Sequence, residues 1–385
     1  MKKNTYLEQP FENLGVHCDA TVKNWYKSRR YVLDLLNDTL DTIDVLPEHW
    51  HFVVDGDNDL MLSVVRHLAL YAHFINYEEN YDTSGNLTCK NRTIITIVSK
   101  KKAEEIEAEL QKPEYLGNLP TLCQMTVFGD KKNEDSYIDI AIEIVTEAGS
   151  NCVLPKSLPV ITEEKVLKYI ESIHPDDIFS IDTCKALCAG KVYELSGVID
   201  NIPFEDINSA NRYANALSMF NNKVLRITHD EKLIEEEWKS NLSAAKSGIS
   251  NVFCSDCFEI REKEIKKIEK KDKLNESDWS KHITELSHCE HNRWVVEKLI
   301  LGYQPLGRKE RFEYEHLFGD SRKAYVKKLK SNIESPMHID ICSNRDLRRI
   351  DPDNMKYDSF LMLAIPLILS NIRHTCHTKA QKSTT

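Results

Sequence analysis

Glycine is scarce in this sequence, with 12 among 385 residues, or about 3% where about 7% is usual. Phosphate-binding loops concentrate several glycines in a few residues, so little material for such loops is present. The chain has no Walker-type G-x-x-x-x-G-K-[ST] loop, no G-x-S-x-G and no H-E-x-x-H. These absences argue against P-loop enzymes, serine hydrolases of the elbow type and zincin metalloproteases.

An excess of basic residues is also lacking. Lys and Arg number 51 against 61 Asp and Glu, which gives a formal net charge of −10. General nucleic-acid binding needs the opposite balance, because phosphates are neutralised by Lys and Arg. A local basic pocket for a small anion remains compatible with an acidic chain.

Long apolar runs are missing as well. The longest spans residues 360–369, contains Pro366 and is shorter than the ~20 residues that cross a bilayer. No apolar signal segment opens the chain, and its 11 cysteines are odd in number and irregularly spaced. We therefore expect reduced thiols, a cytoplasmic location and no membrane span.

Residues 49–158 alternate strand and helix patterns after a helical lead-in at 1–48. Short apolar or β-branched runs predict strands at 51–54, 93–98, 124–129 and 151–154. Helical patterns lie between them at 60–68, 103–110 and 137–148. This alternation predicts a mostly parallel sheet in an α/β domain.

The chain beyond Pro155 and Pro159 reads as mainly helical. Helices are predicted at 163–173, 182–196, 208–221, 230–246, 276–303 and 356–370, with Asn275 or Ser277 as a cap for the fifth. Acidic and basic residues alternate over 259–273, which is typical of a solvated helix or linker.

Segment 286–303 is the most informative in the chain. Its pattern is E-H-x-R-W-x-x-E-K-x-x-x-G-Y, given by Glu290, His291, Arg293, Trp294, Glu297, Lys298, Gly302 and Tyr303. It resembles the opening helix of the ryanodine-receptor-type (RyR) repeat of bacterial proteins. Lys356, Asp358 and the pair Ile365-Pro366 fit the end of such a repeat, and His338 stands for its His-Pro without the proline.

A degenerate first copy is similar to the same repeat. Pro203-Phe204 stands for its Pro-Trp, and residues 209–212 for its Ser-Asn-Arg. The two resemblances imply a tandem RyR-like domain after the α/β domain. The expected divisions are a first repeat at 159–250, a charged linker at 251–275, a second repeat at 276–375 and a disordered tail at 376–385.

The loop after the first strand is similar to that of the NAD-binding Rossmann domain of potassium-uptake regulators (TrkA-N), which often precedes RyR repeats. Gly56 matches, but Asn58 and Met61 stand where two further glycines let backbone approach a diphosphate. Asp55, Asp57 and Asp59 add repulsive charge. We therefore expect a structural Rossmann-like core that does not bind NAD, with Asp57 or Asn58 capping the helix.

The motif helix offers two interpretations. Glu290, Arg293, Trp294 and Glu297 share one face, being spaced i, i+3, i+4 and i+7. In the first interpretation they form an internal ion-pair cluster around a core tryptophan. In the second, Trp294 or Tyr303 stacks on a flat ring while Arg293 or Lys298 meets phosphate. The resemblance supports the second, because tandem repeats of the receptors hold a purine nucleotide between their halves.

Other clusters carry weaker signals. Cys254 and Cys257 form a lone C-x-x-C that His288, Cys289 and His291 would have to complete for zinc, and ordinary thiols are the simpler interpretation. Paired carboxylates at 176–177, and Asp340 with Asp346, read as solvated turns rather than as acid–base groups. No cofactor or metal is expected.

We therefore predict a non-catalytic sensor or regulator that binds a small nucleotide or nucleotide derivative between RyR-like repeats. The resemblance implies a place in prokaryotic signalling or anti-phage defence, with an effector protein or a second copy as partner. The alternatives are an NAD-dependent or nucleotide-processing enzyme and a protein-interaction scaffold.

Overall fold

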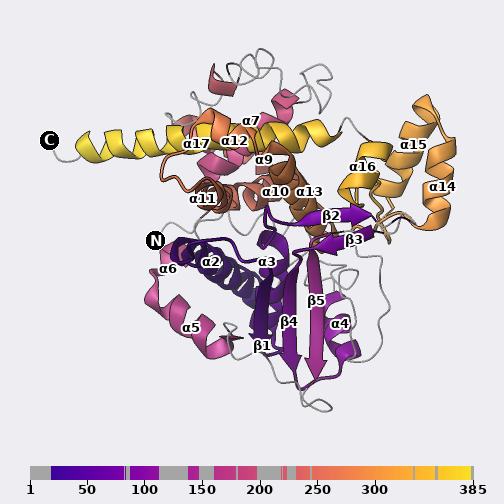
Figure 1. Cartoon of the computed structure of the whole chain (residues 1–385), viewed down its shortest axis with the longest axis horizontal. Helices are drawn as coiled ribbons and strands as arrows, with labels where there is room; N and C mark the ends of the chain where they lie inside the picture. The colour runs from indigo at the N-terminus through magenta and orange to yellow at the C-terminus, as the bar shows by residue number, and fades with distance from the viewer. Residues whose placement is uncertain are drawn as a thin grey trace.

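The structure is a computed structural model of the whole chain. It describes residues 19–81, 83, 87–111, 138–146, 160–178, 181–196, 218, 220–222, 231–242, 245–332, 334–351 and 354–382. An α/β part built on a parallel sheet is followed by a mainly helical part (Figure 1). This arrangement confirms the predicted α/β domain followed by a mainly helical region.

The sheet has four parallel strands in the described residues: β1 (Trp50–Asp55), β4 (Thr93–Ser99), β5 (Ile140–Thr146) and β6 (Val160–Thr162). Their spatial order is β5-β4-β1-β6, with Val53 opposite Thr96 and Thr96 opposite Glu143. Counted along the chain, this is the 3-2-1-4 order of doubly wound folds, so the sheet is compatible with a Rossmann-like domain. The strands predicted at 51–54 and 93–98 are confirmed.

The third and fourth strands differ from the predictions. Residues 137–148 were expected to form a helix, but 140–146 form β5, where Ile140, Ile142 and Ile144 are all buried. β6 begins at Val160 and pairs with β1, so the sheet continues past residue 158, the expected domain boundary. The strands predicted at 124–129 and 151–154 lie outside the described residues.

Helices of the α/β part are α2 (Asp19–Thr42), α3 (Asp59–Tyr71), α4 (Ala103–Gln111), α5 (Glu163–Ser172) and α6 (Pro175–Ile178). α2 lies within the predicted helical lead-in and packs on α3, where Ser28, Ser63 and His67 are hydrogen-bonded in the interior. A hairpin of β2 (Glu78–Tyr81) and β3 (Leu87–Lys90), which was not predicted, leaves this part after α3.

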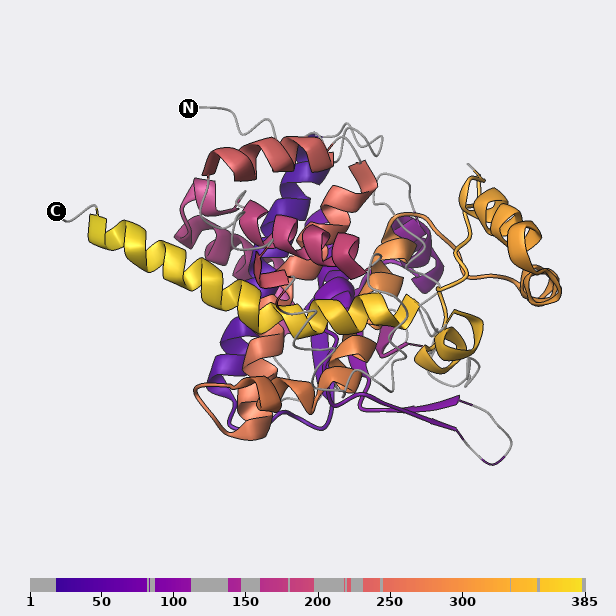
Figure 2. The ribbon, with the colours of Figure 1, turned by 90° about the horizontal axis from the view of Figure 1, so that it is seen from above.

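The helical part contains α7 (Thr183–Ser196), α9 (Glu231–Leu242), α10 (Ala245–Asp256), α11 (Phe258–Glu269), α12 (Glu276–Ser280), α13 (Ile283–Ile300), α14 (Arg308–His316), α15 (Gly319–Lys330), α16 (Asn344–Ile350) and α17 (Met355–Lys382). α17 is the long central helix and packs on α7 and α13 (Figure 2). The helix predicted over 276–303 is divided into α12 and α13, and Asn275 caps α12 through a capping box with Asp278.

α17 is longer than the predicted helix at 356–370. It continues to Lys382, so most of the tail expected to be disordered from 376 is helical. Its segment Met355–Arg373 is long and apolar enough to cross a membrane by length and composition, although more than half of it is buried within the protein. Phe360, Leu361 and Ile365 belong to a buried core shared with α7 and α13.

α11 is not the solvated helix or linker that its alternating charges predicted. Ile260, Arg261, Glu264 and Ile265 are buried. Arg261 Nη1 lies 2.5 Å from Glu264 Oε2 and also donates to the carbonyl of His73. This buried ion pair lies where α11 packs against the end of α3. Charged residues of α11 are therefore part of the interface between the helical part and the α/β part.

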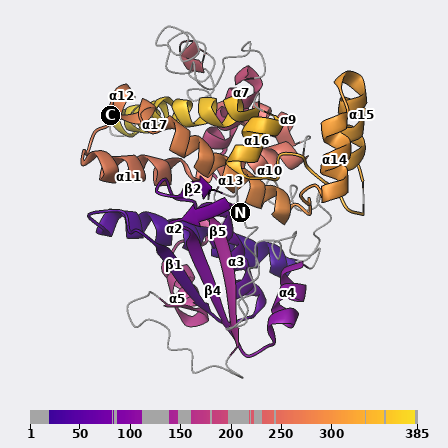
Figure 3. The same cartoon turned by 45° about the vertical axis from the view of Figure 1, so that its right-hand side comes forward.

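The helical part covers the amino-terminal ends of the strands. Figure 1 shows the strands pointing away from it, and Figure 3 shows α14 and α15 standing beside the helical part, away from the sheet. One hydrophobic core joins α2, α3 and the sheet to Val295, Val296 and Leu299 of α13. The carboxyl ends of the strands, where doubly wound folds bind ligands, therefore lie far from the motif helix.

Candidate functional site

The charged face of α13 is buried in the protein. Glu290, Arg293 and Glu297 have at most 1% of their surface exposed. Arg293 Nε and Nη2 donate to the two oxygens of Glu290 at 2.9 and 2.8 Å, and Nη1 donates to Glu297 Oε2 at 2.9 Å. A guanidinium bonded to two buried carboxylates in this way is held firmly inside the molecule.

Neighbouring helices complete this cluster. Ser250 of α10 donates to Glu297 at 2.9 Å, Tyr193 of α7 donates to Glu290 at 3.2 Å, and Lys298 lies 2.6 Å from Glu297. Burial opposes charge on Glu297, but Lys298 and Arg293 outweigh it and lower the pKa of Glu297. The geometry therefore favours the interpretation as an internal ion-pair cluster, in which Arg293 is fully buried and paired with two carboxylates rather than open to a phosphate.

The aromatic residues of the motif, Trp294 in α13 and Tyr303 just after its end, contact His338. Trp294 is partly buried, with the ring of His338 edge-on at a centroid distance of 4.8 Å. Lys298 Nζ lies 5.0 Å from the centroid of the Trp294 ring, a cation–π distance. The ring of Tyr303 also lies edge-on to His338, with centroids 6.0 Å apart. Trp294 and Tyr303 thus meet at His338.

A cavity of about 270 Å³, here called the aromatic cavity, opens beside Trp294. Its lining includes Tyr193 of α7, His291 and Trp294 of α13, and Tyr357 and Asp358 of α17. The remaining lining residues are Lys330, His338, Asp340, Leu347 and Asn354. The cavity thus lies between α7, from the expected first repeat, and α13 and α17, from the expected second.

Three ionisable groups of the aromatic cavity favour their uncharged forms. Burial lowers the pKa of His291 to about 4 and that of His338 to about 2, where Lys330 and Lys298 add to the effect. Burial, with Glu290 nearby, raises the pKa of Asp358 well above its usual range. At neutral pH these three side chains are therefore uncharged, which suits an uncharged planar ring beside them, while Lys330 and Asp340 also belong to the lining.

His291 has a defined orientation in this cavity. Its Nε2–H donates to the carbonyl oxygen of Cys342 at 3.0 Å, which leaves Nδ1 as the acceptor, 3.9 Å from Asp358. His338 Nδ1 accepts the backbone N–H of Asp340 at 3.3 Å. Both imidazoles are therefore held as neutral tautomers by partners in the loop before α16.

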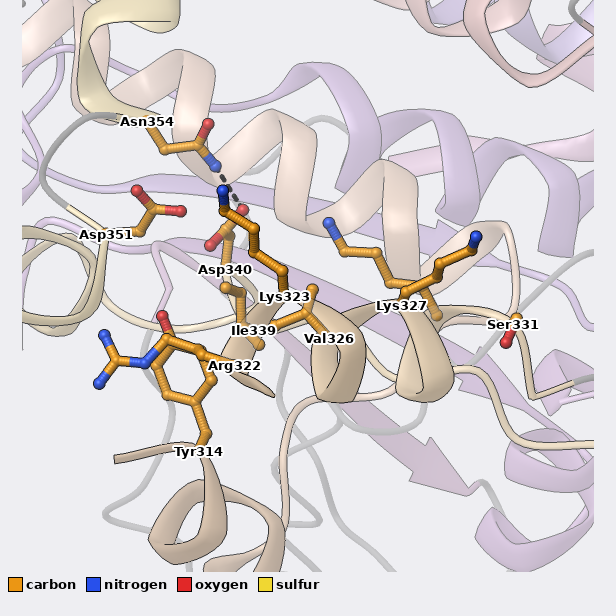
Figure 4. Close-up of a pocket in the computed structure, with 11 residues that line it drawn as sticks. Tyr314, Arg322, Lys323, Val326, Lys327, Ser331, Ile339, Asp340, Asp351 and Asn354 are labelled. Atoms are coloured by element: carbon orange, nitrogen blue, oxygen red, sulfur yellow. Dashed lines mark hydrogen bonds between the residues drawn. The ribbon is translucent and has the colours of Figure 1, made fainter. Parts of the chain in front are cut away.

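A second cavity of about 600 Å³, here called the basic cavity, adjoins the first. Four cationic side chains from α15 line it, against the two carboxylates of Asp340 and Asp351 (Figure 4). The cations are Arg322, Lys323, Lys327 and Lys330.

The lysines of α15 are available to a ligand. Lys323, Lys327 and Lys330 are spaced i, i+4 and i+7, and so share one face of a helix that buries none of its residues. In the part of the chain that the structure describes, no carboxylate forms an ion pair with any of the three. Arg322, by contrast, lies over the ring of Tyr314, 4.7 Å from its centroid.

Asp340 lines both cavities, together with Lys330 and Asn354. It was expected in a solvated turn, but only 2% of it is exposed. Burial, with Asp351 nearby, raises its pKa to about 7. The turn is buried because α15, α16 and the start of α17 fold around it. Asp346 does lie nearer the surface, where it pairs with Arg311 at 3.0 Å.

Sequence reasoning located the motif helix but missed half of the site. Tyr193, Asp340 and the α15 lysines were not predicted to bind a ligand. The i, i+4, i+7 spacing of the lysines was the one available signal for them. The Pro203-Phe204 and 209–212 motifs of the expected first repeat lie outside the described residues.

The Gly56 loop lies at the carboxyl end of β1, away from both cavities. Gly56 has φ +139°, and a Cβ there would come within 3.0 Å of Met61 Cγ. Asn58 Oδ1 accepts the N–H of Met61 at 3.0 Å, as the predicted cap of α3, and Asp57 accepts from Ser99 at 2.6 Å. Ser99 lowers the pKa of Asp57 and keeps it anionic. The capped, acidic helix start offers a diphosphate little attraction.

The cysteines do not assemble a metal site in the described residues. Cys254, Cys257 and Cys289 are buried, and burial raises the pKa of Cys257 to about 12. His291 is bonded to Cys342 as described above. No group of three or more His, Cys, Asp or Glu suited to a metal occurs among these residues.

Neither a protein-family model, nor a curated protein, nor a solved structure matches this chain.

Proposed function

We propose that this protein is a non-catalytic sensor that binds a small nucleotide or nucleotide derivative. Its base would occupy the aromatic cavity and its phosphates the basic cavity. The resemblance to RyR-type repeats supports this proposal, as does the place of the aromatic cavity between α7 and the α13–α17 pair. The same resemblance suggests a regulatory role in prokaryotic signalling or anti-phage defence, within the cytoplasm.

The observation that carries the proposal is the contrast between two adjoining cavities. One has the rings of Trp294, Tyr193 and Tyr357 in its wall, and base–aromatic stacking contributes ~1–3 kcal/mol in other proteins. The other presents Lys327 and Lys330, which form no ion pair with a carboxylate of the described residues. A nucleotide has the same two-part character, with a flat ring at one end and negative charge at the other.

This proposal changes the predicted phosphate partners. Arg293 is held by Glu290 and Glu297, and Lys298 by Glu297 and the Trp294 ring. The lysines of α15 replace them, while Trp294 remains the candidate stacking residue. The Rossmann-like sheet then has a structural role, because it shares a hydrophobic core with α13.

Mass spectrometry of small molecules released from freshly purified protein tests the proposal first. We expect a nucleotide or nucleotide derivative. Calorimetric titration of ligand-free protein with ATP, GTP, CTP, UTP and the cyclic monophosphates then measures affinity. If no nucleotide is released and no nucleotide binds, the proposal is wrong and the protein-interaction scaffold is favoured instead.

Three lysine variants locate the phosphates. Lys327→Ala and Lys330→Ala each remove a charge-assisted bond of ~1.5–3 kcal/mol, so nucleotide affinity should fall at least about tenfold. Lys328→Ala is the matched control, because Lys328 is also on α15 but does not line the basic cavity. Equal affinity in all three variants would place the phosphates elsewhere.

One observation favours a nucleotide-processing enzyme as the second candidate. Asp340 Oδ2 lies 3.5 Å from His338 Nδ1, and the pKa of Asp340 is about 7, which is the range of a general acid or base. Incubating the protein with the nucleotide it binds, followed by chromatography of the products, distinguishes the two. Turnover that Asp340→Asn abolishes would identify an enzyme.

A further inference from the structure

One carboxyl oxygen of Asp340 lacks a hydrogen bond, although the side chain is buried and held in place. Its Oδ2 accepts a hydrogen bond from Asn354 Nδ2, which fixes the orientation of the carboxyl group (Figure 4). Its Oδ1 is buried and finds no hydrogen-bond partner among the residues that the structure describes. A buried polar atom without a partner is costly, so an acceptor held in this way calls for a donor from outside the protein.

The position of Asp340 between the two cavities indicates which group of a ligand would donate the hydrogen bond. Among the described residues, the two cavities share Asp340, Lys330 and Asn354 in their linings, so these three mark the junction between them. In a nucleotide the sugar connects base and phosphate. A ligand with its base beside Trp294 and its phosphates beside Lys327 therefore has its sugar at this junction.

Resting on the proposed function, we infer that Asp340 Oδ1 accepts a hydrogen bond from a ribose hydroxyl, which makes the site selective for ribonucleotides over deoxyribonucleotides. The sugar hydroxyls are the donors available at that part of a nucleotide, and a 2′-deoxy sugar lacks one of them. A site built to bond a hydroxyl discriminates strongly against the analogue that lacks it, because its own buried acceptor is then left unpaired.

Calorimetric titration with ATP, 2′-deoxy-ATP and 3′-deoxy-ATP, and with the matching GTP series, tests this inference. A bond to a carboxylate implies that one of the two deoxy analogues binds at least about tenfold more weakly than its ribonucleotide. This comparison uses the unaltered protein, so it does not depend on whether a variant folds.

Two variants then assign the effect to Asp340. Asp340→Asn keeps the shape but removes the charge, so the ribose-to-deoxyribose ratio should fall toward one. Asp346→Asn is the control, because Asp346 lies in the same segment and lines neither cavity. Circular dichroism confirms that both variants are folded.

The outcomes separate this inference from the function on which it rests. If nucleotides bind but the deoxy analogues bind equally well, or if Asp340→Asn keeps the discrimination, the ribose assignment is overturned and the sensor proposal stands. If no nucleotide binds, both are overturned.

Discussion

Replacing Arg293 by methionine tests whether the motif helix is held by its internal ion pairs. Methionine is apolar and of similar length, so the change largely preserves packing. It removes three N–H···O bonds, two to Glu290 and one to Glu297. Both carboxylates stay at no more than 1% exposure. Removing one partner of a buried charge pair costs ~3–5 kcal/mol, because the other charge is left uncompensated. That is a large share of the ~5–15 kcal/mol stability usual for a folded protein.

Urea unfolding followed by tryptophan fluorescence and circular dichroism measures this loss. Arg349→Met is the matched control, because the Arg349 side chain is 58% exposed and pairs with Glu315 and Asp346 at the surface. Exposed pairs contribute ~0–1 kcal/mol. We therefore expect Arg293→Met to be at least about 2 kcal/mol more destabilising than Arg349→Met.

The pH dependence of the Arg293→Met loss provides a second check. In the native protein the pKa of Glu297 is lowered, so its contribution to stability is present at neutral pH and declines as the pH falls through the folded pKa. Without Arg293 the buried carboxyl groups gain stability by taking up protons. The gap between variant and native protein should therefore be smaller at pH 5 than at pH 8. A loss under about 1 kcal/mol that does not change with pH would refute the ion-pair reasoning and free Arg293 for a ligand.

The remaining predictions concern the junction and the Gly56 loop. The folded-state pKa of Asp340 is raised from 3.8 to about 7, so Asp340 reduces stability progressively as the pH rises from 4 to 7. Asp340→Asn should therefore raise the thermal midpoint relative to native protein at pH 8 and not at pH 4, and a gain that is the same at both pH values would contradict this. Asn58→Ala removes the cap of α3 and should cost ~1 kcal/mol in urea unfolding while leaving nucleotide affinity unchanged. Calorimetric titration with NAD should give no micromolar binding, and such binding would show that the acidic Gly56 loop had been misjudged.

Some features of the fold follow from short stretches of sequence. β4 is a run of β-branched residues, and Asn58 and Asn275 satisfy helix N–H groups from within four residues of their own positions. The predictions for these elements succeeded because the interactions involved are local. They needed no knowledge of what packs against them.

β5 shows where local pattern is insufficient. In residues 140–146 most side chains are buried, since a parallel strand of an α/β sheet is covered on both faces even where, as for β5, it ends the described strand order. Such a run lacks the alternation that marks a half-exposed strand, so it was read as a helix. Partners decide the outcome here, because β5 pairs with β4 over its whole length.

In the candidate site, too, some features follow from local sequence and others from tertiary packing. The sequence by itself determined that Glu290, Arg293 and Glu297 share a face of one helix, because a 3.6-residue period fixes which side chains are neighbours. Only the tertiary structure decided that this face is internal, because Ser250 and Tyr193 close over it from other helices. Likewise the charges of α11 and the turn at Asp340 look solvated in sequence. Their burial depends on segments far away in the chain, and desolvation is a property of the packed molecule rather than of the residues alone.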